Sequence, residues 1–148
     1  FILGLLYNLG ELVVQQISSD KVIAASLLEK DELPWHKQSS VLGFTFGECS
    51  AELLKNWQLP FTIIEPIRNQ DNDDFQYSSD ESKLLYLAKR IMLCNTNNKA
   101  YRTELLLTED ALKQLPIDQN MLTEVSNFCD LERLGILSIL NPSAAMIY

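Results

Sequence analysis

Apolar side chains recur at three- and four-residue intervals along most of this chain, and this spacing is the strongest constraint on its fold. One face of an α-helix carries such a repeat, whereas a half-buried strand alternates apolar and polar residues. Only residues 101–107 could compete as extended chain. The pattern therefore predicts an all-α protein, a bundle of about seven or eight helices.

Prolines, glycines and capping residues divide this repeat into segments. Pro34 can open a helix because the first turn needs no N–H from it, and Gly43 can end that helix. Ser78 and Glu81 have the spacing of a capping box. The helices predicted from these signals span residues 1–17, 21–30, 34–42, 47–57, 60–67, 78–95, 108–115 and 118–134.

An acidic polar segment, residues 69–79, is the clearest interruption between helices. Its run Asp71–Asp74 lacks the glycine and the closing glutamate that an EF-hand calcium loop requires, so we expect a solvated loop. A chain of 148 residues has the usual size of one domain. Residues 1–148 are accordingly predicted to form a single domain.

Charge and cysteine content narrow the function classes. The net charge is −8 and no basic patch occurs, which disfavours nucleic acid and anionic membranes as partners. The apolar start is interrupted by Asn8 and Glu11, well before the roughly 20 apolar residues of a membrane-spanning helix. Three widely spaced cysteines do not form a disulfide framework. We therefore expect a cytoplasmic protein.

Three ordered motifs carry a family resemblance. Residues 4–12, GLLYNLGEL, resemble the Gly-Leu-Leu-His-Asp-Ile-Gly-x-Leu segment of HD-related proteins. Residues 42–54, LGFTFGECSAELL, with WQLP at 57–60, are similar to a stretch of HDOD domains that contains Asp-His and ends in Trp-x-Leu-Pro. Residues 64–67, IEPI, resemble the helix that leads into the His-His pair of that family. The resemblance extends over residues 1 to about 95 and more loosely beyond.

The resemblance implies an all-helical, HD-like bacterial signalling domain that acts as an output or scaffold. It also implies that this chain is the C-terminal part of an HDOD domain and lacks the N-terminal helical part. Because the first helix would then expose apolar surface, a homodimer or an exchange of helices between copies is a further expectation.

HD phosphohydrolases hold one or two metal ions with histidines and aspartates, and the metal activates water. The positions that the resemblance assigns to those ligands are Tyr7, Asn8, Thr45, Phe46, Asn69 and Gln70. Phenylalanine has no lone pair for a metal, and neutral amides are weak ligands without carboxylates beside them. We therefore expect no catalytic, cofactor-binding or metal residue, no cofactor and no enzymatic activity.

The predicted function is regulation in signal transduction through contacts with other signalling domains or proteins. Two alternatives remain open. One is a metal-dependent HD phosphohydrolase acting on nucleotides or cyclic dinucleotides. The other is a ligand-sensing module, which predicts an enclosed cavity lined by Tyr7, Phe46 and Asn69.

Other chemically capable side chains favour structural roles. His36, the single histidine, has no cysteine or histidine within helical reach to share a metal. The cysteines are expected to pack on apolar helix faces. The aromatic side chains at helix ends are expected in the core, with a pocket as the alternative. These residues are Cys49, Cys94, Cys129, Trp35, Trp57 and Phe61.

Overall fold

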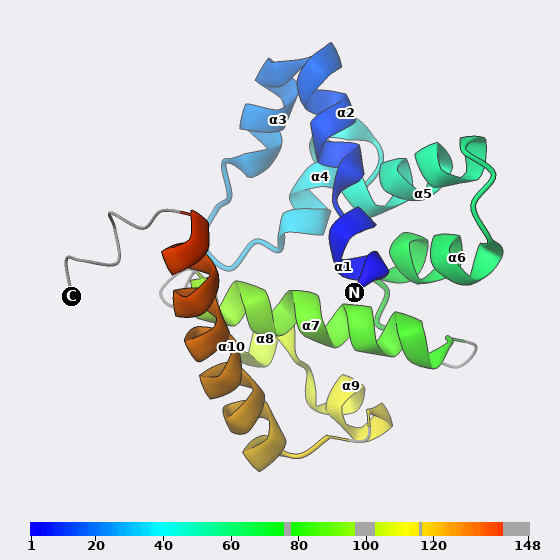
Figure 1. The fold of residues 1–148 in the computed structure, drawn as a ribbon. Helices are drawn as coiled ribbons and strands as arrows, with labels where there is room; N and C mark the ends of the chain where they lie inside the picture. Colours follow the sequence, from blue (N-terminus) through cyan, green and yellow to red (C-terminus); the bar gives the residue numbers. More distant parts are fainter. Residues whose placement is uncertain (76–77, 97–102, 116, 141–148) are drawn as a thin grey trace. The chain divides into compact units, whose positions relative to one another are not determined.

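A computed structural model describes residues 1–75, 78–96, 103–115 and 117–140 (Figure 1). The chain divides into two compact units, Phe1–Leu115 and Pro116–Tyr148, which are described separately. The single domain expected over residues 1–148 stays a prediction. Every regular element in the described ranges is a helix, which confirms the all-α fold class.

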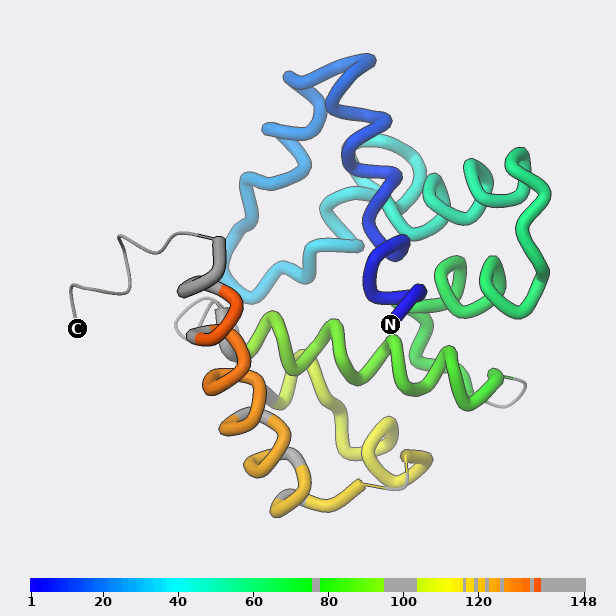
Figure 2. The backbone as a smooth tube through the Cα atoms, viewed as in Figure 1, coloured from blue at the N-terminus to red at the C-terminus, as the bar shows by residue number. Residues whose placement is uncertain are grey.

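The first unit contains nine of the labelled helices, and its path is traced in Figure 2. They are α1 (Ile2–Leu6), α2 (Leu9–Ile17), α3 (Ser19–Ser26), α4 (Pro34–Leu42), α5 (Phe46–Asn56), α6 (Phe61–Asn69), α7 (Asp80–Thr96), α8 (Thr103–Leu106) and α9 (Glu109–Gln114). The second unit contributes α10 (Gln119–Leu140). The predicted number of helices was too low because the first one is split and the short α8 was missed.

The break in the first predicted helix lies at Tyr7 and Asn8. Asn8 takes a non-helical conformation, φ −117° and ψ 19°, at the start of α2. Asparagine favours such cap positions because its side chain competes with the helical backbone. The N–H of Glu11 bonds to the Asn8 carbonyl at 3.2 Å, and the Tyr7 carbonyl accepts hydrogen bonds from distant side chains instead.

Helix ends follow the predicted signals in most places. Pro34 opens α4, and Gly43 closes it in the left-handed region at φ 81°. Thr108 caps α9, where its hydroxyl accepts the Ala111 N–H. At α7, however, the cap is Ser79 and not Ser78, because the Ser79 hydroxyl accepts the Ser82 N–H at 3.2 Å.

Helix α5 packs against both α2 and α6, and α6 packs against α7. One buried cluster joins α5, α6 and α7: Ala51, Leu54, Ile64, Ile67 and Leu85. A second joins α2 and α3 to the start of α5: Val14, Val22, Ala25 and Phe46. Of the positions that match the HD motifs, Tyr7 packs against the first cluster and Phe46 belongs to the second.

Three residues expected to be buried are exposed. Trp57, predicted to face inward from α5, is 57% exposed, and Phe61 at the start of α6 is 74% exposed. Both lie at the ends of the turn that connects α5 to α6, outside the apolar face that the two helices share. In the second unit, Cys129 is exposed on α10. Among the described residues, no helix is long and apolar enough to cross a lipid bilayer.

Candidate functional site

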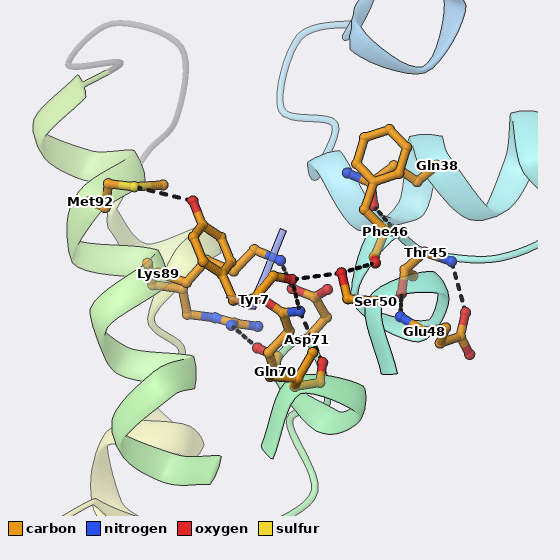
Figure 3. Close-up of polar contacts among 12 residues, drawn as sticks. Tyr7, Gln38, Thr45, Phe46, Glu48, Ser50, Gln70, Asp71, Lys89 and Met92 are labelled. Atoms are coloured by element: carbon orange, nitrogen blue, oxygen red, sulfur yellow. Dashed lines mark hydrogen bonds and ion pairs between the residues drawn. The ribbon is translucent and has the colours of Figure 1, made fainter. Parts of the chain in front are cut away.

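Three of the six positions assigned to HD metal ligands meet at one place in the first unit, drawn in Figure 3. Tyr7 lies at the break between α1 and α2, Phe46 is the first residue of α5, and Gln70 follows α6. Hydrogen bonds from the Ser50 and Gln70 side chains hold these backbone segments together. We call Tyr7, Ser50, Gln70, Asp71, Lys89 and Arg90 the junction cluster.

Ser50 is the centre of the neutral part of this cluster. Its fully buried hydroxyl accepts the Gly10 N–H at 2.7 Å. The same oxygen lies 3.1 Å from the Tyr7 carbonyl and 2.8 Å from the Phe46 carbonyl, either of which can accept its proton. A Cβ at residue 10 would come within 2.8 Å of the Ser50 nitrogen. Glycine at this position therefore lets α2 approach α5 closely enough for the hydroxyl to connect them.

Gln70 fills the position of a family histidine with an amide. Its side-chain nitrogen donates to the Tyr7 carbonyl at 3.0 Å and to the Ile67 carbonyl at 2.9 Å. Gly47 makes room for it, because a Cβ there would meet the Gln70 amide nitrogen and lie 3.0 Å from the Ile67 carbonyl. Both amide protons are thereby used within the protein. An amide nitrogen offers no lone pair to a metal, and the amide oxygen, the one atom of this side chain that could ligate a metal, is buried and has no hydrogen-bond partner among the described residues.

The other assigned positions serve local structure. The Asn8 side chain donates to Glu11, and the Asn69 side chain donates to Glu65 at 3.0 Å. Thr45 forms a complete capping box with Glu48 at the start of α5. Such caps satisfy the N–H groups of a first helical turn that would otherwise lack partners. These three side chains are therefore not directed at a shared site.

Two of the three side chains expected to line a cavity, Tyr7 and Phe46, pack in apolar clusters. Phe46 is 6% exposed and packs with Val14 and its neighbours in the second cluster. Tyr7 packs against the first cluster, and its hydroxyl approaches the Met92 sulfur at 3.8 Å. Burial raises the pKa of the Tyr7 phenol. The apolar packing at Tyr7 and Phe46 favours a filled core over a ligand cavity.

An ionic part of the cluster connects the segment after α6 to α7. The Lys89 ammonium lies 2.6 Å from an Asp71 carboxylate oxygen, and both side chains are largely buried, 12% and 10% exposed. Burial lowers the pKa of Lys89, and the Asp71 charge opposes that shift. A buried charge is tolerated only when it is paired, so the pair fixes this segment on α7.

Arg90 supplies a second buried cation beside Lys89. Its guanidinium donates to the Gln70 carbonyl at 3.2 Å and to an Asp73 carboxylate oxygen at 3.1 Å. The guanidinium carbon also lies 3.2 Å from the Tyr86 ring centroid and 4.4 Å from that of Trp35. Arg90 therefore holds the backbone of Gln70, one of the assigned positions, through a direct hydrogen bond.

The acidic segment is a loop in which Asn72, Asp73 and Asp74 are exposed, as its composition predicts, but it is also tied to α7 by contacts that the composition does not predict. Asp71 pairs with Lys89, and Asp73 pairs with Arg90 and accepts the Tyr86 hydroxyl at 2.5 Å. Phe75 is buried against Tyr86, with ring centroids 4.7 Å apart. The acidic residues alone do not predict these partners, because the cations lie on α7, 17 or 18 residues further along the chain. The sequence feature that could have indicated the pairs is the presence of two adjacent cations, Lys89 and Arg90, on the buried face of α7, because buried lysine and arginine require acidic partners.

The remaining candidates behave largely as expected. His36 is exposed near the start of α4, beside Trp35. Cys49 and Cys94 each pack against a buried cluster, and burial raises the pKa of the Cys49 thiol. Within the described residues, no group of three or more histidine, cysteine, aspartate or glutamate side chains could hold a metal ion. The donor set of the cluster therefore does not fit the metal centre of an HD phosphohydrolase.

Residues 1–73 match the family model of the HDOD domain. This part of the chain belongs to the HDOD family. The match corrects two expectations, because it ends at residue 73 instead of about 95, and it lies in the N-terminal part of this chain. The helices from α7 onward lie outside the match. No curated protein and no solved structure gives a significant match.

The HDOD match includes all six positions assigned to metal ligands, as well as Ser50 and Asp71. The two cations of the junction cluster lie outside it, on α7. The HDOD segment thus receives its ionic partners from the part of the chain that follows it. HDOD family membership supports a role related to signalling.

Proposed function

We propose that this chain is a non-catalytic regulatory module of signal transduction that acts through contacts with other signalling proteins or with a second copy. The observation that supports it most is the hydrogen bonding of Gln70. Its amide protons are taken up by the Tyr7 and Ile67 carbonyls at the place where a phosphohydrolase would present imidazole nitrogens to a metal.

Two further observations support a contact function. Trp57 and Phe61 are both exposed, one at each end of the turn between α5 and α6. Aromatic side chains of this kind contribute strongly to protein interfaces when a partner covers them. The face of α1 also exposes Phe1, Ile2 and Leu5. These surfaces are suited to helix-to-helix contact.

The rival phosphohydrolase is tested by phosphate release. The purified full chain is incubated with nucleotides and cyclic dinucleotides and with Mn²⁺, Fe²⁺ or Mg²⁺, beside an active HD phosphohydrolase as a positive control. We expect release at the level of a blank without protein. Metal-dependent release that is lost in Gln70→Ala but kept in the exposed control Gln58→Ala would refute the non-catalytic assignment.

Association with a second copy is tested by light scattering over a range of protein concentrations. The expected result is a mass that rises with concentration in the unmodified chain and stays that of a monomer in Leu5→Asp. Leu5 is 62% exposed, so this change affects the surface and not the core. A monomer at all concentrations would remove the second copy from the proposal and leave other signalling proteins as partners.

A further inference from the structure

The surroundings of Lys89 differ from those of an ordinary surface lysine. Its ammonium lies 2.6 Å from Asp71 Oδ1 and 5.5 Å from the Trp35 ring centroid. A carboxylate together with an aromatic face is the environment in which proteins bind organic ammonium groups. Divalent metals instead take several oxygen or nitrogen ligands, and an aromatic face supplies none. The site is therefore built for an ammonium ion.

Two acceptor atoms of the junction cluster have no hydrogen-bond partner among the described residues. They are Gln70 Oε1 and Asp71 Oδ2, and both are buried. A buried acceptor without a partner is costly unless a positive charge lies nearby. Removing the ammonium would take from Asp71 the cation at 2.6 Å and leave Arg90, which bonds to the Gln70 carbonyl and to Asp73, as the remaining cation of the cluster.

The neighbouring residues show why a cation belongs here. Gln70 occupies a position that the HD resemblance gives to a metal ligand, and Asp71 follows it directly. Gln70 is connected to α7 through its own carbonyl, which accepts from Arg90 at 3.2 Å. The Lys89 side chain thus enters beside the replaced ligand position from the adjacent helix (Figure 3).

We propose that the Lys89 ammonium is the resident cation of the junction cluster, a covalently attached substitute for a bound metal ion. The lysine neutralises Asp71 and makes occupation of the cluster independent of metal supply. The HDOD segment then keeps one fixed arrangement, set by a residue of α7. The proposal goes beyond the proposed function, and it is tested by stability, so either can fail without the other.

A double-mutant cycle tests the pairing in the full chain. Lys89→Met removes the charge and keeps most of the side-chain volume, Asp71→Asn removes its partner, and the double variant removes both. The control is Lys83→Met, on the same helix, whose partner Asp80 is 99% exposed. We expect each single variant at the cluster to lower the urea midpoint more than the control does. The double variant should then have a higher midpoint than Lys89→Met.

A charge reversal tests the substitution for a metal. Lys89→Asp puts a second carboxylate into the cluster that holds Asp71 and the Gln70 oxygen, and carboxylate and carbonyl oxygens are ligands that suit Mn²⁺. We expect Mn²⁺ to raise the urea midpoint of this variant and to leave the unmodified chain unchanged. Matched NaCl controls for ionic strength, and Lys83→Asp controls for an added carboxylate on α7.

The contrary results are equally concrete. The proposal is overturned if Lys89→Met lowers the urea midpoint by no more than Lys83→Met does. It is equally overturned if Asp71→Asn has the same urea midpoint as the unmodified chain. It is also overturned if Mn²⁺ stabilises the unmodified chain as much as Lys89→Asp. If Lys89→Met does not fold, Asp71→Asn and the double variant decide between these outcomes.

Discussion

The neutral and the ionic parts of the junction cluster hold the same segment in different ways. Around Ser50 and Gln70, uncharged groups bond to backbone carbonyls, and two glycines bring the helices close enough for this. Around Lys89 and Arg90, buried cations hold the segment after α6 through carboxylates and a carbonyl. The neutral part lies within the HDOD match, whereas the cations lie outside it. The difference suggests that the family core sets helix packing and that α7 fixes the segment at its end.

The largest effect is expected in the ionic part, for Arg90→Ala. Arg90 is 1% exposed, so the change leaves a cavity and removes the donor to the Gln70 carbonyl. Loss of one partner of a buried ion pair costs about 3–5 kcal/mol, and the partial exposure of Asp73 places the expected loss near the lower end, at about 3 kcal/mol. Urea unfolding followed by circular dichroism measures it.

Arg68→Ala is the matched control, because Arg68 pairs with Glu52 at the surface. Exposed pairs contribute about 0–1 kcal/mol, so this variant should stay within that range. Equal losses for the two arginines would show that the cations of α7 do not fix the segment.

In the neutral part, the largest effect is expected for Gly10→Ala. The new Cβ would lie 2.8 Å from both Cys49 Cβ and the Ser50 nitrogen, closer than packed atoms allow. Overpacking of this kind costs about 1–3 kcal/mol. Thermal unfolding should therefore show a lower midpoint. Gly4→Ala is the control, since no atom lies within 4 Å of its Cβ and alanine favours a helix by up to about 1 kcal/mol. A stable Gly10→Ala chain would contradict the close approach of α2 and α5.

Ser50→Ala tests the hydrogen bonds without a change of packing. The Gly10 N–H would lose its partner in a buried place, which costs about 1–3 kcal/mol. We expect about 1–2 kcal/mol in urea unfolding, because the methyl group fills most of the space. Ser40→Ala, at an exposed position of α4, should change stability by less than about 0.5 kcal/mol. If both serines behave alike, the Ser50 hydroxyl does not connect the helices.

The neutral part could be predicted from sequence better than the ionic part. Gly43 was predicted to end a helix, and the structure confirms it. Gly10 and Gly47 lie in the motifs that carry the family resemblance and permit the close approaches described above. Their effect is local and depends on one missing side chain. The pair of Asp71 and Lys89 depends on how α7 packs, because the two residues are 18 positions apart in sequence. Spacing along a helix carries no information about such a pairing.

The exposed aromatic residues mark another limit of the sequence. Trp57 lies at helical spacing from Leu53 and Leu54, so the apolar repeat places it in the core. The helix ends at Asn56, and the chain then turns through Gln58 in the left-handed region at φ 59°. This turn takes Trp57 out of the helical repeat and leaves its ring at the surface. An apolar residue in a helical repeat is predicted to be buried only as far as the helix continues.

The smallest expected effect concerns pH and isolates one hydroxyl of the ionic part. Burial and the hydrogen bond to Asp73 raise the pKa of Tyr86 above its usual value of 10.0. A raised pKa in the folded state contributes stability below pH 10 that is lost as pH rises, at up to about 1.4 kcal/mol per pH unit. The lowered pKa of Lys89 has the opposite effect on stability below its usual 10.5, so the pH dependence of stability of the unmodified chain contains both contributions.

The difference in free energy of unfolding between the unmodified chain and Tyr86→Phe contains only the Tyr86 contribution. This difference should therefore shrink by about 1 kcal/mol from pH 9 to pH 11. Tyr7→Phe is the comparison, because burial also raises the pKa of the Tyr7 phenol, which is less buried, so a smaller change of the same sign is expected there. A difference that stays constant over this range would mean that Tyr86 ionises as freely in the folded chain as in the unfolded one, and that Asp73 and Arg90 do not enclose its hydroxyl.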